Sequence, residues 1–122
     1  MSKSILIVED DKWLAENYSR SLVSAGYDTT ISLHAIAAID IIDDIHPDAI
    51  ILDVLLTGST AFTLLHELQS YDDTGKIPII ICTNLASELL IDNLAPYGVN
   101  KILDKTTMMP DDLIAAVKSV LL

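Results

Sequence analysis

The chain is poor in positive charge and has no long apolar run. Lysine and arginine together number 7 against 18 aspartates and glutamates, which gives a formal net charge of −11 over 122 residues. Because proteins bind nucleic acids through clustered basic residues that neutralise phosphates, we expect no direct contact with nucleic acid. No apolar run approaches the roughly 20 residues of a membrane span, and no basic-then-apolar leader is visible. We therefore expect neither a membrane segment nor a secretory signal.

Cysteine and glycine are also scarce. The one cysteine, Cys82, cannot form an internal disulfide, which fits a reducing, cytoplasmic location. A flavin-binding domain with alternating strands and helices would need a loop rich in Ser, Thr or Gly after its first strand to hold a phosphate. The chain has Glu9-Asp10-Asp11 there instead. These acids would repel a phosphate, so an electron carrier of that kind is not expected.

What the chain does contain is a regular alternation of two apolar patterns. Short runs rich in β-branched residues predict strands, and the stretches between them have the helical period of apolar residues. The predicted strands are Ser4–Val8, Asp28–Ser32, Ala49–Leu52, Ile77–Thr83 and Val99–Leu103. Gly26 follows the first predicted helix as a C-terminal cap, and Pro110 begins the last helix.

Nearly continuous apolar strands imply burial on both faces of the sheet. Five strand–helix units of this kind predict an α/β fold, a doubly wound parallel sheet with helices on both sides. The length fits a single domain over residues 1–122, and we expect no output domain within it.

Polar residues gather where the predicted strands end. In such a sheet, ligands bind beyond the carboxyl ends of the strands. Glu9 and Asp10 follow the first strand, Asp53 follows the third, Thr83 ends the fourth and Lys105 follows the fifth. Each alone could be a turn, cap or surface residue, but their common position favours a site. Clustered carboxylates require a cation, and Mg²⁺ suits oxygen ligands.

Four segments together resemble the response regulator receiver family of two-component signalling. ILIVEDD is similar to the family's first strand and acidic pair, and PDAIILDVLL to its third strand and phosphoacceptor. IPIIICT resembles the fourth strand with its terminal threonine, and ILDK resembles the fifth strand with its lysine. The resemblance covers nearly the whole chain and implies the flavodoxin-like (βα)5 receiver fold with strand order 2-1-3-4-5.

The resemblance also implies a role for each site residue. Glu9, Asp10, Asp53 and the backbone carbonyl of Leu55 would hold Mg²⁺, and Asp53 would be the nucleophile that takes the phosphoryl group. Thr83 would hydrogen-bond a phosphoryl oxygen, and Lys105 would pair with the phosphoryl group and Asp53. Asp11 is expected to begin a helix rather than to bind the metal.

The function implied is that of a phosphoacceptor in a two-component phosphorelay. Its donor would be a sensor histidine kinase or a phosphotransfer protein, and phosphorylation would switch binding to an unknown downstream partner. The chain would not be an enzyme, except that it would catalyse its own phosphorylation and dephosphorylation. The alternative is a degenerate receiver that binds a partner without phosphorylation. The complete set of site residues argues against that alternative, and altered loops argue for it.

Several positions depart from the family pattern. Thr57 and Ala61 stand where a proline and a glycine are usual, and Asn84 stands where the residue is usually small. Thr106 replaces a proline that often follows a cis bond, so we predict a trans bond after Lys105, or a visibly strained cis one.

The region before Lys105 has no switch aromatic. We therefore expect output through the predicted helix Ala86–Ala95 and the last strand–helix unit. The apolar residues of that helix could equally be buried, or could bind a partner or form a homodimer.

Overall fold

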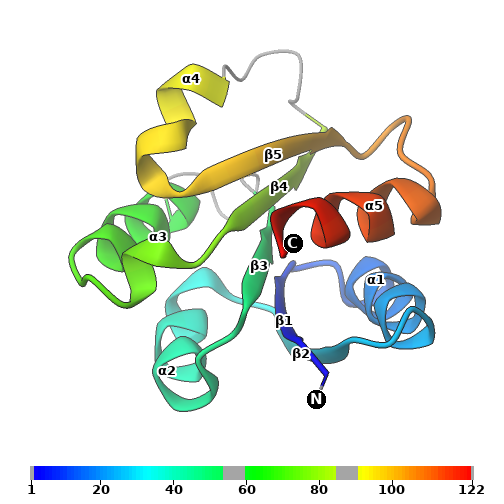
Figure 1. Ribbon diagram of the computed structural model, residues 1–122, viewed down its shortest axis with the longest axis horizontal. Helices are drawn as coiled ribbons and strands as arrows, with labels where there is room; N and C mark the ends of the chain where they lie inside the picture. The colour runs from blue at the N-terminus through cyan, green and yellow to red at the C-terminus, as the bar shows by residue number, and fades with distance from the viewer. Residues whose placement is uncertain (1, 54–59, 85–90, 122) are drawn as a thin grey trace.

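A computed structural model describes residues 2–53, 60–84 and 91–121. Five strands alternate with helices along the chain (Figure 1). The strands are β1 (Ser4–Val8), β2 (Asp28–Ser32), β3 (Ala49–Leu52), β4 (Ile79–Thr83) and β5 (Val99–Asp104). The α-helices are α1 (Lys12–Ser24), α2 (Ala35–Ile45), α3 (Thr60–Gln69), α4 (Ile91–Leu94) and α5 (Pro110–Val120), with 3-10 turns η1 (Thr74–Lys76) and η3 (Ala95–Tyr97).

The strands form one parallel sheet in the order β2-β1-β3-β4-β5, which confirms the predicted fold class and strand order. The first three strands have the predicted bounds. The fourth begins at Ile79, so the prediction of a strand from Ile77 was wrong. Pro78 has no backbone N–H to donate to a ladder, although its carbonyl accepts a hydrogen bond from Ile50 N at 3.0 Å.

The apolar strands divide their side chains between two cores. Alternate residues of a strand point to opposite faces of the sheet. Leu6, Val8 and Leu52 pack with α2 and α3 on one face, whereas Ile7 and Ile51 pack with α1 and α5 on the other. Figure 1 shows α1 and α5 together on one side of the sheet and α2 and α3 on the other. Burial on both faces explains why these strands have no polar alternation.

Local capping residues fix the helix ends as predicted. Asp11 is the N-cap of α1, where its Oδ1 accepts a hydrogen bond from Leu14 N at 3.2 Å. Gly26 follows the C-cap of α1 with a φ of 100°, a left-handed conformation that costs glycine little. Pro110 is the first residue of α5. Asp11 therefore begins a helix, as expected.

The fourth predicted helix is only partly within the described residues. The structure shows α4 at Ile91–Leu94, and the chain then continues as η3 rather than as α-helix. Pro96 explains this change, because the residue before a proline is disfavoured in the α conformation. Residues 86–90, on which the proposed output surface depends, lie outside the described residues, as do Leu55 and Thr57. No described helix is long and apolar enough to cross a membrane.

Candidate functional site

The register of the sheet brings three charged residues to one edge. Val8 of β1 lies beside Leu52 of β3, so Glu9 and Asp53, the residues that follow them, are neighbours. Asp53 N donates to the Val8 carbonyl at 3.1 Å, and Lys105 N donates to the Thr83 carbonyl at 3.0 Å. These hydrogen bonds continue the ladders one residue past the strands. They hold Asp53 and Lys105 at the carboxyl-end edge that the sequence indicated.

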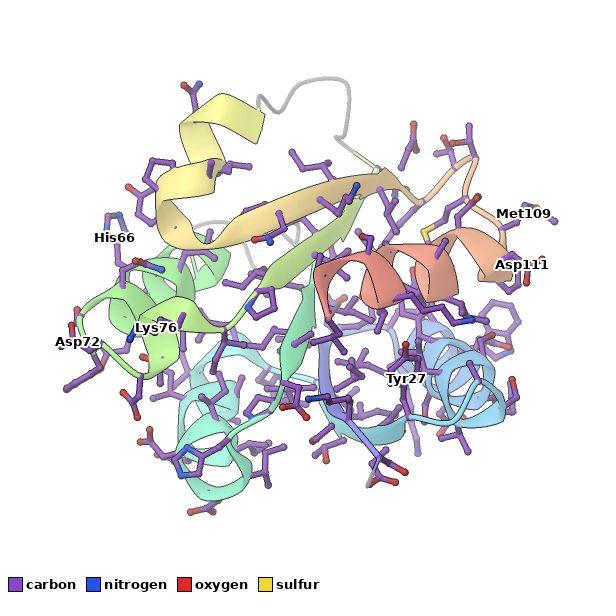
Figure 2. The ribbon with its side chains drawn as sticks, viewed as in Figure 1. Tyr27, His66, Asp72, Lys76, Met109 and Asp111 are labelled. Carbon is purple, nitrogen blue, oxygen red and sulfur yellow. The ribbon has the colours of Figure 1, made fainter. Side chains whose placement is uncertain are left out.

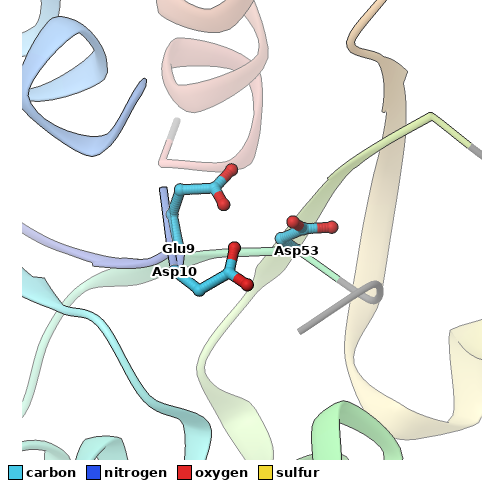
Figure 3. A group of neighbouring side chains, drawn as sticks. All are labelled: Glu9, Asp10 and Asp53. Carbon is cyan, nitrogen blue, oxygen red and sulfur yellow. The ribbon is translucent and has the colours of Figure 1, made fainter. Parts of the chain in front are cut away.

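Three carboxylates come together at this edge. Glu9 and Asp10 follow β1, Asp53 follows β3, and one oxygen from each lies within 4.8 Å of the others (Figure 3). Glu9 and Asp53 are buried, with 1% and 4% of their surface exposed, and Asp10 is exposed. Closely spaced carboxylate oxygens, one of them open to solvent, are a donor set that a hard divalent cation prefers. This group could therefore hold a metal ion.

Lys105 neutralises part of this charge. Its Nζ donates a hydrogen bond to Asp53 Oδ2 at 2.8 Å and lies 2.5 Å from Glu9 Oε1. Glu9 Oε1 is fully buried, and Lys105 is its ion-pair partner. The resemblance had placed Lys105 beside Asp53, but the contact with Glu9 was not predicted. No local signal in the sequence distinguishes it from a contact with Asp53 alone.

The buried setting shifts the pKa values of the site. Burial raises the pKa of Glu9 to about 7, although Lys105 and the backbone N–H of Asp11 favour its charged form. Burial alone would lower the pKa of Lys105, but its contacts with Asp53 and Glu9 outweigh that effect and raise it. Lys105 therefore stays protonated beside the carboxylates. A cation in contact with Glu9 would favour the ionised carboxylate in the same way.

The remaining predicted residues lie nearby, with differing exposure. Thr83 ends β4 and is fully buried, one strand away from Asp53. Asn84, directly after it, is exposed and lines the same groove as Asp53. The described residues contain no cis peptide bond, which confirms the trans bond between Lys105 and Thr106. The carbonyl of Leu55, the remaining predicted metal ligand, lies outside the described residues.

A groove of about 670 Å³ opens from the carboxylates and runs between α1 and α5. Trp13 and Tyr18 of α1 and Met109 before α5 line it together with Asp53 and Lys105. Trp13 and Met109 are strongly exposed, at 69% and 65%. Tyr18 lies on the buried face of α1 and packs in the core on that side of the sheet. No feature of the sequence indicated that it also lines this groove.

Cys82 lies one residue before Thr83 and is buried among apolar side chains. Burial raises the pKa of its thiol to about 12. Because the thiolate is the reactive form, we expect the folded protein to resist alkylation by iodoacetamide at mildly alkaline pH. The same reagent should modify Cys82 fully in denaturant, as measured by intact mass. Rapid labelling of the folded protein would contradict an inert core thiol.

Comparisons with known proteins agree with this arrangement. Residues 5–118 match the family model described as "Response regulator receiver domain". "Response regulator MprA" of Mycobacterium bovis (strain BCG / Pasteur 1173P2) is 34% identical over 83 residues, which cover 68% of this chain and 35% of that protein. The match thus spans about a third of the length of that relative.

Two solved structures extend the likeness over nearly the whole chain. A structure described as a response regulator from Chloroflexus aurantiacus J-10-fl has a TM-score of 0.84 and 32% identity, covering 99% of this chain and 98% of that one. The receiver domain of a signal transduction histidine kinase from Syntrophus aciditrophicus has a TM-score of 0.82 and 28% identity, covering 98% and 90%.

Proposed function

We propose, from the premise that the chain belongs to the response regulator receiver family, that Asp53 accepts a phosphoryl group in a Mg²⁺-dependent reaction. The observation that carries the proposal is the position of the Asp53 carboxylate. It lies close to the carboxylates of Glu9 and Asp10, and the ammonium group of Lys105 contacts both Asp53 and Glu9. A nucleophile thus stands next to both a cation site and a fixed positive charge.

Phosphoryl transfer needs an in-line nucleophile and neutralisation of the phosphoryl oxygens. In the proposed step, an Asp53 oxygen attacks the phosphorus atom of a phosphohistidine on a sensor histidine kinase or a phosphotransfer protein. The phosphorus–nitrogen bond breaks, its electron pair goes to the imidazole, and an aspartyl phosphate forms. Mg²⁺, held by Glu9, Asp10 and Asp53, would neutralise charge on the phosphoryl oxygens.

Two further residues support the transferred group. The Lys105 ammonium, which lies 2.8 Å from Asp53, would pair with a phosphoryl oxygen as charge develops there. Thr83, at the end of the neighbouring strand, would donate a hydrogen bond to another oxygen. Water later attacks the phosphorus atom, the bond between Asp53 and phosphorus breaks, and inorganic phosphate leaves the restored carboxylate. The chain thus catalyses only its own phosphorylation and dephosphorylation.

Phosphorylation would change how the chain binds a downstream protein or a second copy of itself. The surface we favour is residues 86–95 together with β5 and α5. This protein would work in the cytoplasm, where its one cysteine would stay reduced.

The test is to incubate the wild-type chain with acetyl phosphate and Mg²⁺ and to measure the intact mass. We expect one phosphoryl group per chain with Mg²⁺ and none when EDTA replaces the metal. Acetyl phosphate removes the need for a cognate kinase, so the result depends on this chain alone. A chain that gains no phosphoryl mass with Mg²⁺ would favour the phosphorylation-independent binding module instead.

A further inference from the structure

A second groove lies between α2 and α3, on the opposite face of the sheet from α1 and α5. It has a volume of about 270 Å³, and its apolar lining includes Ile39, Leu68 and Tyr71. Thr74 is buried at its edge and donates a hydrogen bond from Oγ1 to the Leu68 carbonyl at 2.6 Å. This bond ties the segment that carries Tyr71 to the end of α3, so the groove is a built feature of the fold.

Tyr71 is the exposed part of this lining. Its side chain is 58% exposed, whereas Leu68 is buried. A tyrosine offers large contact area at a low cost in conformational entropy, and aromatic residues of this kind often anchor protein interfaces. A groove of this volume is smaller than the roughly 300–1,000 Å³ of most small-molecule sites. It is better suited to one or two side chains of another protein.

The rim of the groove is strongly acidic. Asp43, Glu67 and Asp73 line it directly. Six of the chain's 18 acidic residues lie in the two segments that form it: Asp40, Asp43, Asp44, Glu67, Asp72 and Asp73. In the described part of the chain, none of these six lies within 4.0 Å of a lysine or arginine nitrogen. Their charge is therefore available to a partner.

We propose that this groove binds a basic amphipathic helix of a partner protein. An apolar side chain of the helix would pack against Tyr71 and Leu68, and its lysines or arginines would lie beside the acidic rim. Nucleic acids and anionic membranes are disfavoured because the rim would repel them. Exposed ion pairs contribute about 0.2–1 kcal/mol each, so the apolar contact provides the anchor and the charges provide selectivity.

The groove lies away from the carboxylate site. Ile42 and Asp43 are near the end of α2, which leads into β3, and Tyr71 and Thr74 lead into β4. The groove is therefore near the amino ends of the strands, whereas Asp53 is at their carboxyl ends. Figure 2 places Asp72 and Lys76 on the α3 side of the molecule and Met109 and Asp111 at the opposite edge. A helix bound here would leave Asp53 accessible, and its binding does not depend on phosphorylation.

The experiment uses a synthetic helical peptide with leucine at positions i, i+3, i+4 and i+7 and lysine elsewhere, titrated into the whole chain labelled with ¹⁵N. We expect the largest amide shifts at residues 39–43 and 67–74, little change at Trp13, and no binding by the same peptide with glutamate in place of lysine. Tyr71→Ser should weaken binding by at least about 10-fold. Val23→Ser, at an equally exposed apolar site on α1, should not.

A charge-matched pair of variants separates this site from general attraction to an acidic protein. The triple variant D43N/E67Q/D73N should weaken binding much more than E16Q/D28N/D111N, which removes the same charge elsewhere. The amide spectrum of each variant confirms its fold. Equal weakening by both triple variants, shifts centred on the Trp13 groove, or unchanged binding by Tyr71→Ser would each overturn the proposal. None of these results depends on whether Asp53 takes a phosphoryl group.

Discussion

Asp53→Asn is expected to reduce phosphoryl uptake from one group per chain to none in the presence of Mg²⁺ and acetyl phosphate. An amide has nearly the same shape as the carboxylate but is neither an anionic nucleophile nor a good metal ligand. Asp53 is 4% exposed and accepts a hydrogen bond from Lys105, so the substitution changes the chemistry of the site while keeping its volume. Intact mass measures the uptake, and amide spectra check that the variant is folded.

The matched control is Asp28→Asn, the same substitution at an exposed aspartate that begins β2. It should take up the phosphoryl group as the wild type does. A variant at position 53 that still gained phosphoryl mass would show that another residue is the acceptor. Peptide mapping of the modified chain would then identify it.

Lys105→Met is expected to lower the free energy of unfolding by about 3 kcal/mol in metal-free buffer of mildly alkaline pH. Methionine keeps most of the side-chain volume but leaves the buried carboxylates of Glu9 and Asp53 without a compensating charge. Domains of this size have a total stability of about 5–15 kcal/mol, so the variant should remain folded but be clearly weakened. Urea unfolding with EDTA present measures the difference.

The stability lost in Lys105→Met should depend on pH. The pKa of Glu9 is raised to about 7 in the folded chain, above its usual value in the unfolded chain. The folded state therefore binds more protons between those two values, and the contribution of Glu9 to stability falls as pH rises through that window. Removing the Lys105 charge raises the pKa of Glu9 further. Lys105→Met should thus cost less near pH 5, where Glu9 is protonated, than near pH 8.

A control and an added metal make the result specific. Lys101→Met replaces an exposed lysine on β5, the strand that Lys105 follows, and should change stability by less than about 0.5 kcal/mol. Mg²⁺ should restore part of the stability lost in Lys105→Met, because a ligand that binds only the folded state stabilises it. A Lys105→Met chain as stable as the wild type near pH 8 would mean that Lys105 does not compensate these carboxylates.

The sequence was sufficient to predict the fold and most of the site. Burial of β1, β3 and β4 on both faces left continuous apolar runs, and the ends of β1 and β3 were located to the residue. Parallel strands place their carboxyl ends at one edge, so the polar residues that follow them could be assigned to a common site. The start of β4 was misplaced because apolar content suggested Ile77, while Pro78 limits the ladder.

Tertiary structure alone decided which of these residues touch and which are buried. Glu9 belongs to an acidic run that is typical of a solvated turn. In the structure it is 1% exposed and paired with Lys105, 96 residues further along the chain. Tyr18 and Leu68 each lie in a helix whose apolar residues recur with the helical period. Both are core residues, but each also lines a groove that exists only because two helices pack at a particular spacing.

Some features could be predicted from the sequence and others could not, because the former depend on residues close together in the chain and the latter on residues far apart in it. Strand and helix periods, caps and proline effects depend on neighbours in the sequence, so the chain itself determined the elements and the order of chemical groups along it. Contacts such as Lys105 with Glu9, the raised pKa that results from burial, and the shape of the α2–α3 groove depend on residues that meet only when the sheet and its two layers of helices have assembled.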